Sequence, residues 1–265
     1  MLSVKISIMR NIKLLLEYEG TRYEGWQSQR KKHAPTIQET IEEGLRRITG
    51  GPVDLVASGR TDAGVHALAQ AAAFKTDSTI RVDALRKGLN SMLPEDIRVI
   101  GAEVAPLDFH PRHDAVKKTY FYLIGLSPAL PVFLRRYMWA LPYKLDLKAM
   151  EEAASHLRGE RDFCSFRASG CGAKSTVRRL MELEIKRKRK MDFLTFSFKG
   201  EFLKISLSAD GFLRHMARNI VGTLVEVGRG RISPEALPGI IASRDRRKAG
   251  PSAPAHGLFL ERVYY

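Results

Sequence analysis

The sequence has very little cysteine and no long hydrophobic run. Its 265 residues include only two cysteines, Cys164 and Cys171, which excludes a disulfide framework and favours a reducing, cytoplasmic location. No apolar stretch approaches the roughly 20 residues that a membrane-spanning helix needs. Residues 1–19 alternate polar and apolar side chains and lack the apolar core of a secretory signal peptide. We therefore expect no membrane partner.

Acidic residues are also few compared with basic ones. The chain has 44 Lys and Arg residues against 29 Asp and Glu, a net charge of +15. Such a balance favours a polyanionic partner, most often a nucleic acid. The charge is uneven, because residues 1–104 carry a net +2 and residues 105–265 carry +13. The densest basic run, residues 186–190, is interpreted either as a solvated hairpin tip or as an arm that contacts phosphates.

Several kinds of catalytic site lack their residues. The sequence has no Cys-x-x-Cys pair, and its acidic residues do not cluster as a two-metal nuclease requires. The segment 170–176 contains Lys174 but lacks the glycine that precedes the lysine of a phosphate-binding loop. We therefore expect neither a metal nor a nucleotide cofactor.

Hydrophobic periodicity predicts an α+β fold with a mainly antiparallel sheet. Strands are expected at residues 11–18, 53–57, 67–74, 97–104, 116–124, 177–185, 193–198, 202–207 and 258–264. Helices are expected at residues 37–49, 83–92, 146–157, 212–227 and 234–242. The first of these helices follows a capping box, Thr36 to Glu39. A linker at 106–111 would separate an N-terminal domain, 9–105, from a basic C-terminal domain, 106–265.

One segment between two predicted strands combines residues that can carry chemistry. It reads SGRTDAGVHA and spans residues 58–67. Its glycines permit a tight turn and a close approach of a ligand to the backbone. Arg60 lies two residues before Asp62, and a nearby guanidinium favours the ionised form of a carboxylate. An ionised carboxylate can act as a nucleophile or base, although a salt-bridged turn would use the same residues.

This segment closely resembles the catalytic motif of the tRNA pseudouridine synthase A (TruA-type) family. Further resemblances follow in order, at residues 16–27, 36–39, 108–112, 118–122, 162–167, 215–222 and 257–260. The resemblance implies that residues 1–8 are an extension and that Met9 is the true start. Residues 170–173 and 186–190 depart from the family pattern, which puts the tRNA preference in doubt but not the reaction class.

The resemblance implies an isomerase that converts uridine to pseudouridine at positions 38, 39 and 40 of the tRNA anticodon arm, without a metal or cofactor. Asp62 would be the nucleophile, attacking the ribose C1′ or the uracil ring or acting through a glycal. Tyr120 would stack near the target uracil, and Arg60 would help to displace the target base. Arg218 would pair with Asp62, and Leu258 would pack beneath the base.

The resemblance also implies a fold and an assembly. Two similar α/β halves would share a central, mainly antiparallel sheet, with helices on one face and a basic cleft on the other. The protein would be a homodimer, with tRNA crossing both subunits. Two alternatives remain open: a non-catalytic RNA-binding protein built from RRM-like halves, and a metal-dependent nuclease. The first lacks the aromatic signature of an RRM, and the second lacks a carboxylate cluster.

Overall fold

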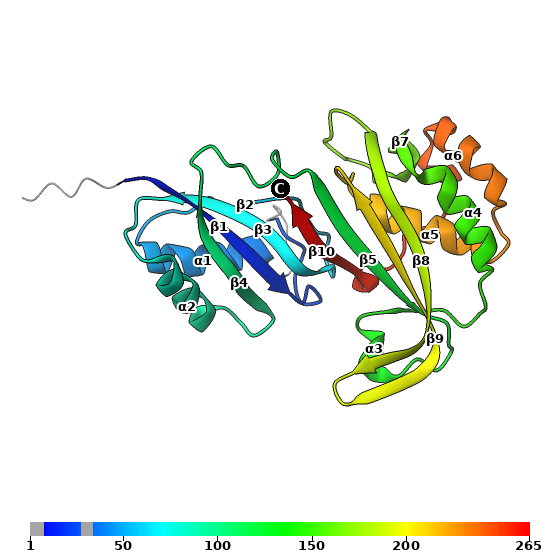
Figure 1. Cartoon of the computed structure of the whole chain (residues 1–265), viewed down its shortest axis with the longest axis horizontal. Helices are drawn as coiled ribbons and strands as arrows, with labels where there is room; N and C mark the ends of the chain where they lie inside the picture. Colours follow the sequence, from blue (N-terminus) through cyan, green and yellow to red (C-terminus); the bar gives the residue numbers. More distant parts are fainter. Residues whose placement is uncertain (1–7, 28–33) are drawn as a thin grey trace, which may run out of the picture. The chain divides into compact units, whose positions relative to one another are not determined.

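The computed structural model describes residues 8–27 and 34–265, which form two compact units (Figure 1). The first unit extends to Val116 and also contains residues 260–265, and the second spans Lys117–Phe259. Residues 106–116 pack with the first unit, because the Asn11 side-chain amide donates hydrogen bonds to the carbonyls of Pro106 and Phe109 at 2.9 Å. Of the expected extension, residues 1–8, only Ile8 is among the described residues.

The first unit contains an antiparallel sheet with β1 (Arg10–Tyr18) between two partner strands. β1 pairs with β3 (His66–Thr76) on one side and with β4 (Ile97–Ala105) on the other. The short β2 (Val56–Ala57) adds to β3, and β10 (Leu258–Tyr264) also neighbours β3.

Two helices complete the first unit. α1 (Ile37–Thr49) and α2 (Val82–Met92) pack against each other, and α2 packs against β4 (Figure 1). The capping box is confirmed, since Thr36 Oγ1 accepts a hydrogen bond from the Glu39 N–H at 3.3 Å. α1 ends at Gly50 in a left-handed conformation with φ 77°, as glycine readily allows.

The second unit is built on four antiparallel strands. Their order is β5 (Lys117–Gly125), β9 (Phe196–Ala209), β8 (Val177–Phe193) and β7 (Gly159–Asp162), with β6 (Trp139–Ala140) parallel to β5. Its helices include α4 (Leu147–Leu157), α5 (Met216–Gly228) and α6 (Leu237–Ser243). α4 packs against β8, α5 and α6 (Figure 1). Shorter turns are α3 (Val132–Arg135), η1 (Phe163–Phe166), η2 (Pro234–Ala236), η3 (Arg246–Lys248) and η4 (Ala255–Gly257). The predicted α+β class with a mainly antiparallel sheet is confirmed.

Some predicted boundaries are wrong. The three short strands expected between residues 177 and 207 are two long strands, which turn at Leu194 rather than within the basic run 186–190. The far end of this hairpin is stabilised by a small core of Leu130, Leu134, Met138 and Phe202. The helix expected from residue 212 begins at Met216, because His215 adopts a left-handed backbone with φ 63°.

α5 makes an unusually close backbone contact at Gly222. A Cβ at this position would lie 1.7 Å from the Pro251 carbonyl oxygen, well inside any real contact. Gly239 in α6 is a matched contrast, because it is exposed and a Cβ there would meet nothing within 4 Å. Both glycines are helical, so helix propensity alone favours alanine at either position.

We expect Gly222→Ala to lower the free energy of unfolding by about 1–3 kcal/mol or more, because the backbone of residue 251 must move. Gly239→Ala should raise it by about 0.5–1 kcal/mol through reduced backbone entropy. Urea unfolding of both variants, followed by far-UV circular dichroism, measures the difference. Equal stability of the two variants would contradict the close packing of α5.

Candidate active site

Asp62 lies in a loop between β2 and β3 of the first unit. Its side chain is half-buried, whereas Arg60 in the same loop is exposed. The loop turns immediately after Asp62, because the Val65 N–H donates to the Asp62 carbonyl at 3.1 Å. Gly64 supplies the positive φ, 76°, that this turn needs. Arg60 and Asp62 therefore lie in one short loop, with Arg60 just before the turn that Asp62 begins.

A neighbouring segment, residues 20–26, packs its backbone against the backbone of the Asp62 loop. A Cβ at Gly20 would lie 2.0 Å from the Val65 carbonyl oxygen, and one at Gly25 would lie 2.6 Å from that of Thr61. The Trp26 N–H donates to the Thr61 carbonyl at 3.0 Å. Only glycine permits such an approach at both points, so the position of the loop depends on these residues.

Buried side chains of the strands support the loop from beneath. The hydroxyls of Tyr18 and Thr61 are 2.8 Å apart and share a hydrogen bond. Burial raises the pKa of Tyr18, so its phenol stays neutral and able to donate. On β3, the fully buried Gln70 accepts from Ser58 Oγ at 2.6 Å and donates to the Gly59 carbonyl at 2.8 Å. These bonds fix the loop on both sides of Arg60.

His66 forms a further link at the end of the loop. The ring is 2% exposed, and its Nδ1 accepts a hydrogen bond from the Gly20 N–H at 3.1 Å. Glu19 Oε1 lies 3.4 Å from the same nitrogen. Accepting at Nδ1 leaves the proton of the neutral ring on Nε2. Tyr18, Gln70 and His66 were not singled out from the sequence, although each is a polar residue at a strand position that faces inward.

The remaining predicted residues belong to the second unit. Tyr120 lies on β5 opposite Leu207, is 7% exposed and meets Phe212 edge to face with ring centroids 4.9 Å apart. Leu258 opens β10 and is 5% exposed. The preceding residue, Gly257, packs on the Tyr122 ring, because a Cβ at Gly257 would lie 2.6 Å from Tyr122 Cζ.

Arg218 lies in the first turn of α5 and is half-buried. Its Nε donates to the Ala253 carbonyl at 2.8 Å, and the Ala253 N–H donates back to the Arg218 carbonyl at 3.1 Å. Burial raises the pKa of Tyr122, and the Arg218 charge partly offsets this effect. Arg218, Tyr122 and the segment that leads to Leu258 therefore form one neighbourhood of the second unit.

The basic run 186–190 lies on β8, and several of its cations are paired with acidic groups. Lys186 Nζ is 2.8 Å from Glu184, Arg187 bonds to Glu201, and Lys190 is 3.7 Å from Asp192. A hydrogen bond from Ser197 and the charge of Lys190 keep the pKa of Asp192 below its usual range, so this partner stays ionised. Exposed pairs of this kind contribute little stability and leave the cations available to another anion.

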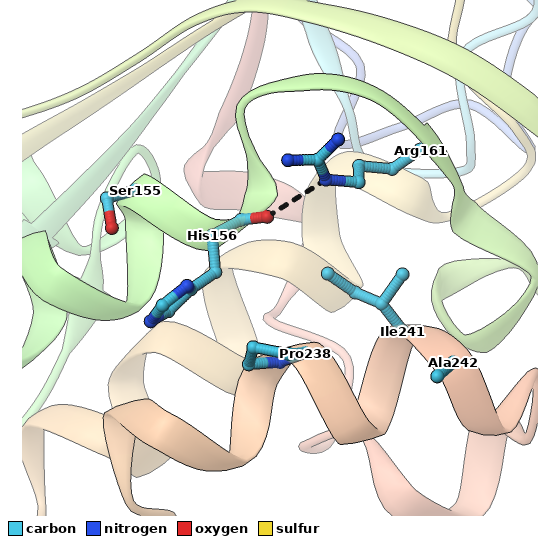
Figure 2. A pocket seen from close by; sticks show the side chains of 6 residues that line it. All are labelled: Ser155, His156, Arg161, Pro238, Ile241 and Ala242. Atoms are coloured by element: carbon cyan, nitrogen blue, oxygen red, sulfur yellow. Dashed lines mark hydrogen bonds between the residues drawn. The ribbon is translucent and has the colours of Figure 1, made fainter.

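A hollow of about 300 Å³ lies between α4 and α6, away from all the predicted residues. Pro238, Ile241 and Ala242 of α6 line it on one side, and Ser155, His156 and Arg161 line it on the other (Figure 2). Arg161 Nε donates to the His156 carbonyl at 3.4 Å. The hollow contains no group suited to the chemistry expected of Asp62.

Other kinds of site lack support in the part of the chain that the structure describes. Within residues 8–27 and 34–265, no group of three or more His, Cys, Asp or Glu side chains could hold a metal ion. Within the same ranges, no helix is long and apolar enough to cross a membrane. Cys164 and Cys171 are both free thiols and half-buried.

Comparison with known proteins gives consistent matches over nearly the whole chain. The family model described as tRNA pseudouridine synthase matches residues 15–114 and 153–265. A protein named tRNA pseudouridine synthase A from Moorella thermoacetica is 48% identical, covering 96% of this chain and 99% of its own. Proteins of the same name from Caldicellulosiruptor bescii and Acetivibrio thermocellus are 47% and 45% identical, each covering 97% of this chain and 100% of its own. By these matches, the chain belongs to the tRNA pseudouridine synthase family.

Proposed function

We propose that this protein isomerises uridine to pseudouridine at positions 38, 39 and 40 of the tRNA anticodon arm, with Asp62 as the nucleophile. The observation that carries the proposal is the fixed position of the Asp62 loop in a chain of this family. Close contacts at glycines and buried hydrogen bonds hold the loop in place. Relatives named tRNA pseudouridine synthase A cover 97% and 96% of the chain and support tRNA as the substrate class. The enzyme would act in the cytoplasm as a homodimer, with tRNA crossing both subunits.

The reaction needs a held base and a fixed carboxylate. The C1′–N1 bond of uridine breaks, the uracil turns, and a C1′–C5 bond forms while the C5 proton is lost to solvent and N1 gains one. The atoms of substrate and product are the same, so no oxidant, reductant or cofactor is consumed. Asp62 would attack the ribose C1′ or the uracil ring, or act through a glycal. A rigid loop suits each of these routes, because the detached base must not move away.

The other residues would prepare and hold the target nucleotide. A base within a stem leaves its stack at a cost of a few kcal/mol. Arg60, exposed in the same loop as Asp62, would help to displace it. Tyr120 would stack near the uracil, Leu258 would pack beneath it, and Arg218 would pair with the Asp62 carboxylate. Most of the net charge lies in residues 105–265, which would bind the phosphates of the tRNA.

Replacing Asp62 with Ala should abolish turnover and leave tRNA binding intact. The assay measures tritium release from tRNA that carries uracil tritiated at C5, with EDTA present. We expect release to fall by at least about 10³-fold, because the nucleophile is lost. Asp54→Asn, which changes an exposed carboxylate before the same loop, should release tritium like the wild type.

Three outcomes would contradict the assignment, and two of them would support an alternative. Turnover in Asp62→Ala would show that the nucleophile lies elsewhere. Binding without tritium release from the wild-type protein would favour the non-catalytic RNA-binding protein. Strand breaks that depend on Mg²⁺ would indicate a nuclease.

Changing residues 186–190 to Ser should weaken tRNA binding and reduce its dependence on salt, if these cations contact phosphates. A matched variant carries Glu184→Gln, Asp192→Asn and Glu201→Gln, which remove their acidic partners. It should strengthen binding and keep the salt slope. Titration of labelled tRNA at several salt concentrations measures both. An unchanged slope in the Ser variant would show that the run does not contact the tRNA.

A further inference from the structure

In the second unit, hydrogen bonds from residues of α5 hold the segment 249–254 against that helix. Arg218 exchanges two hydrogen bonds with Ala253, through its Nε and its carbonyl, at 2.8 and 3.1 Å. The next residue, Asn219, accepts from the Ser252 hydroxyl with its Oδ1. Two consecutive residues of the helix therefore fix two consecutive residues of the segment.

Asn219 is fully buried and uses both ends of its amide. Its Nδ2 donates to the Phe166 carbonyl in η1 at 2.7 Å, which sets the orientation of the side chain. Its Oδ1 then faces Ser252 and also accepts from Arg246 Nη2 at 3.0 Å. A carbonyl oxygen has two lone pairs, so both acceptor positions of Asn219 are occupied.

Arg246 links the start of the segment 249–254 to Asn219. Its Nη1 donates to the Ala249 carbonyl at 3.2 Å, while Nη2 reaches Asn219 and lies 3.4 Å from Ser252 Oγ. The planar guanidinium thus ties the start of the segment to α5. A lysine could not repeat this fork, because its ammonium is a single point of contact.

The backbone of the segment also packs closely against α5. A Cβ at Gly250 would lie 2.7 Å from Thr223 Cα, and Gly222 is in similar contact with Pro251. The Gly250 N–H donates to Thr223 Oγ1 at 2.9 Å, and that hydroxyl donates to the Asn219 carbonyl at 2.7 Å. The hydrogen bonds of Asn219 and Arg246 therefore act on a segment that already touches the helix.

We propose that Arg246 and Asn219 are positioning residues that fix the Arg218 guanidinium for the reaction. The Arg218 Nε is committed to the Ala253 carbonyl, so the direction of its terminal nitrogens depends on where that carbonyl lies. The carbonyl is placed by Ser252, Asn219 and Arg246 together. The inference rests on the role proposed above for Arg218. If Arg218 has that role, its position matters, because a misplacement of about 1 Å can reduce catalysis about 10²-fold.

A nuclear magnetic resonance experiment tests the positioning without any tRNA. It measures solvent exchange of the Arg218 Nε–H, assigned by its loss in Arg218→Lys. Arg246→Ala should accelerate this exchange by about tenfold or more, because the Ala253 carbonyl is no longer held. Ser252→Ala, which removes one hydroxyl, should act in the same direction and tests the idea if Arg246→Ala does not fold.

Arg229→Ala is the matched control. Arg229 also lies next to α5, is half-buried, pairs with Glu226 at 2.9 Å and covers the Tyr143 ring at 4.3 Å. Its loss should lower stability and leave the Arg218 exchange unchanged. Equal exchange in the wild type, Arg246→Ala and Ser252→Ala would overturn the proposal, as would faster exchange in Arg229→Ala.

Kinetics then test the consequence for the reaction. Arg246→Ala should lower kcat for tritium release about 10- to 100-fold, with the KM for tRNA within about twofold of the wild type. Arg246→Lys should recover part of the loss. In an Arg218→Lys background, Arg246→Ala should cause no further decrease, because both changes remove the same interaction.

The outcomes separate this inference from the proposed function. Additive losses in the double variant would show that Arg246 acts independently of Arg218 and would overturn the inference. A wild-type protein that releases no tritium, but whose Arg218 exchange responds to Arg246→Ala, would refute the proposed function while the positioning of Arg218 stands.

Discussion

Backbone contact at glycine is the constraint on which the placement of both groups of site residues depends. In the first unit, residues 20 and 25 let a neighbouring segment touch the carbonyls of the Asp62 loop. In the second, Gly222 lets the segment that carries Ala253 touch α5. A single methyl group at any of these points would enter the space of a backbone oxygen. The geometry around Asp62 and Arg218 therefore follows from missing side chains as much as from those present.

Such close contacts bury polar groups, and the structure pairs them. Across residues 8–27 and 34–265, no buried side-chain nitrogen or oxygen lacks a hydrogen-bond partner. Gln70 beneath the Asp62 loop and Asn219 beneath the 249–254 segment use both ends of their amides. An amide with both ends committed has one orientation, so it specifies position as well as adding stability.

Local pattern predicts much of the fold, whereas the catalytic role of the block around Asp62 stays a prediction. The helix after Thr36 and the strand that became β1 follow from capping and alternation, and the block around Asp62 stands out by its residues. A hairpin is predicted here, but the length of β8 and β9 and the turn at Leu194 are not, because a run of basic residues breaks the apolar pattern that signals a strand. The start of α5 was missed because His215 adopts a backbone conformation that its residue type rarely takes.

The supports of the site could not be found from spacing at all. Arg246 is separated from Asn219 by 27 residues, and Tyr18 from Thr61 by 43. Neither pair leaves a periodic mark in the sequence, and the basic residues at 244–248, which include Arg246, are equally consistent with a surface for phosphates. The same residue type can thus serve either purpose, and only its surroundings separate the two. An arginine among neutral acceptors fixes the backbone, whereas cations paired loosely with carboxylates on an exposed strand remain available to bind RNA.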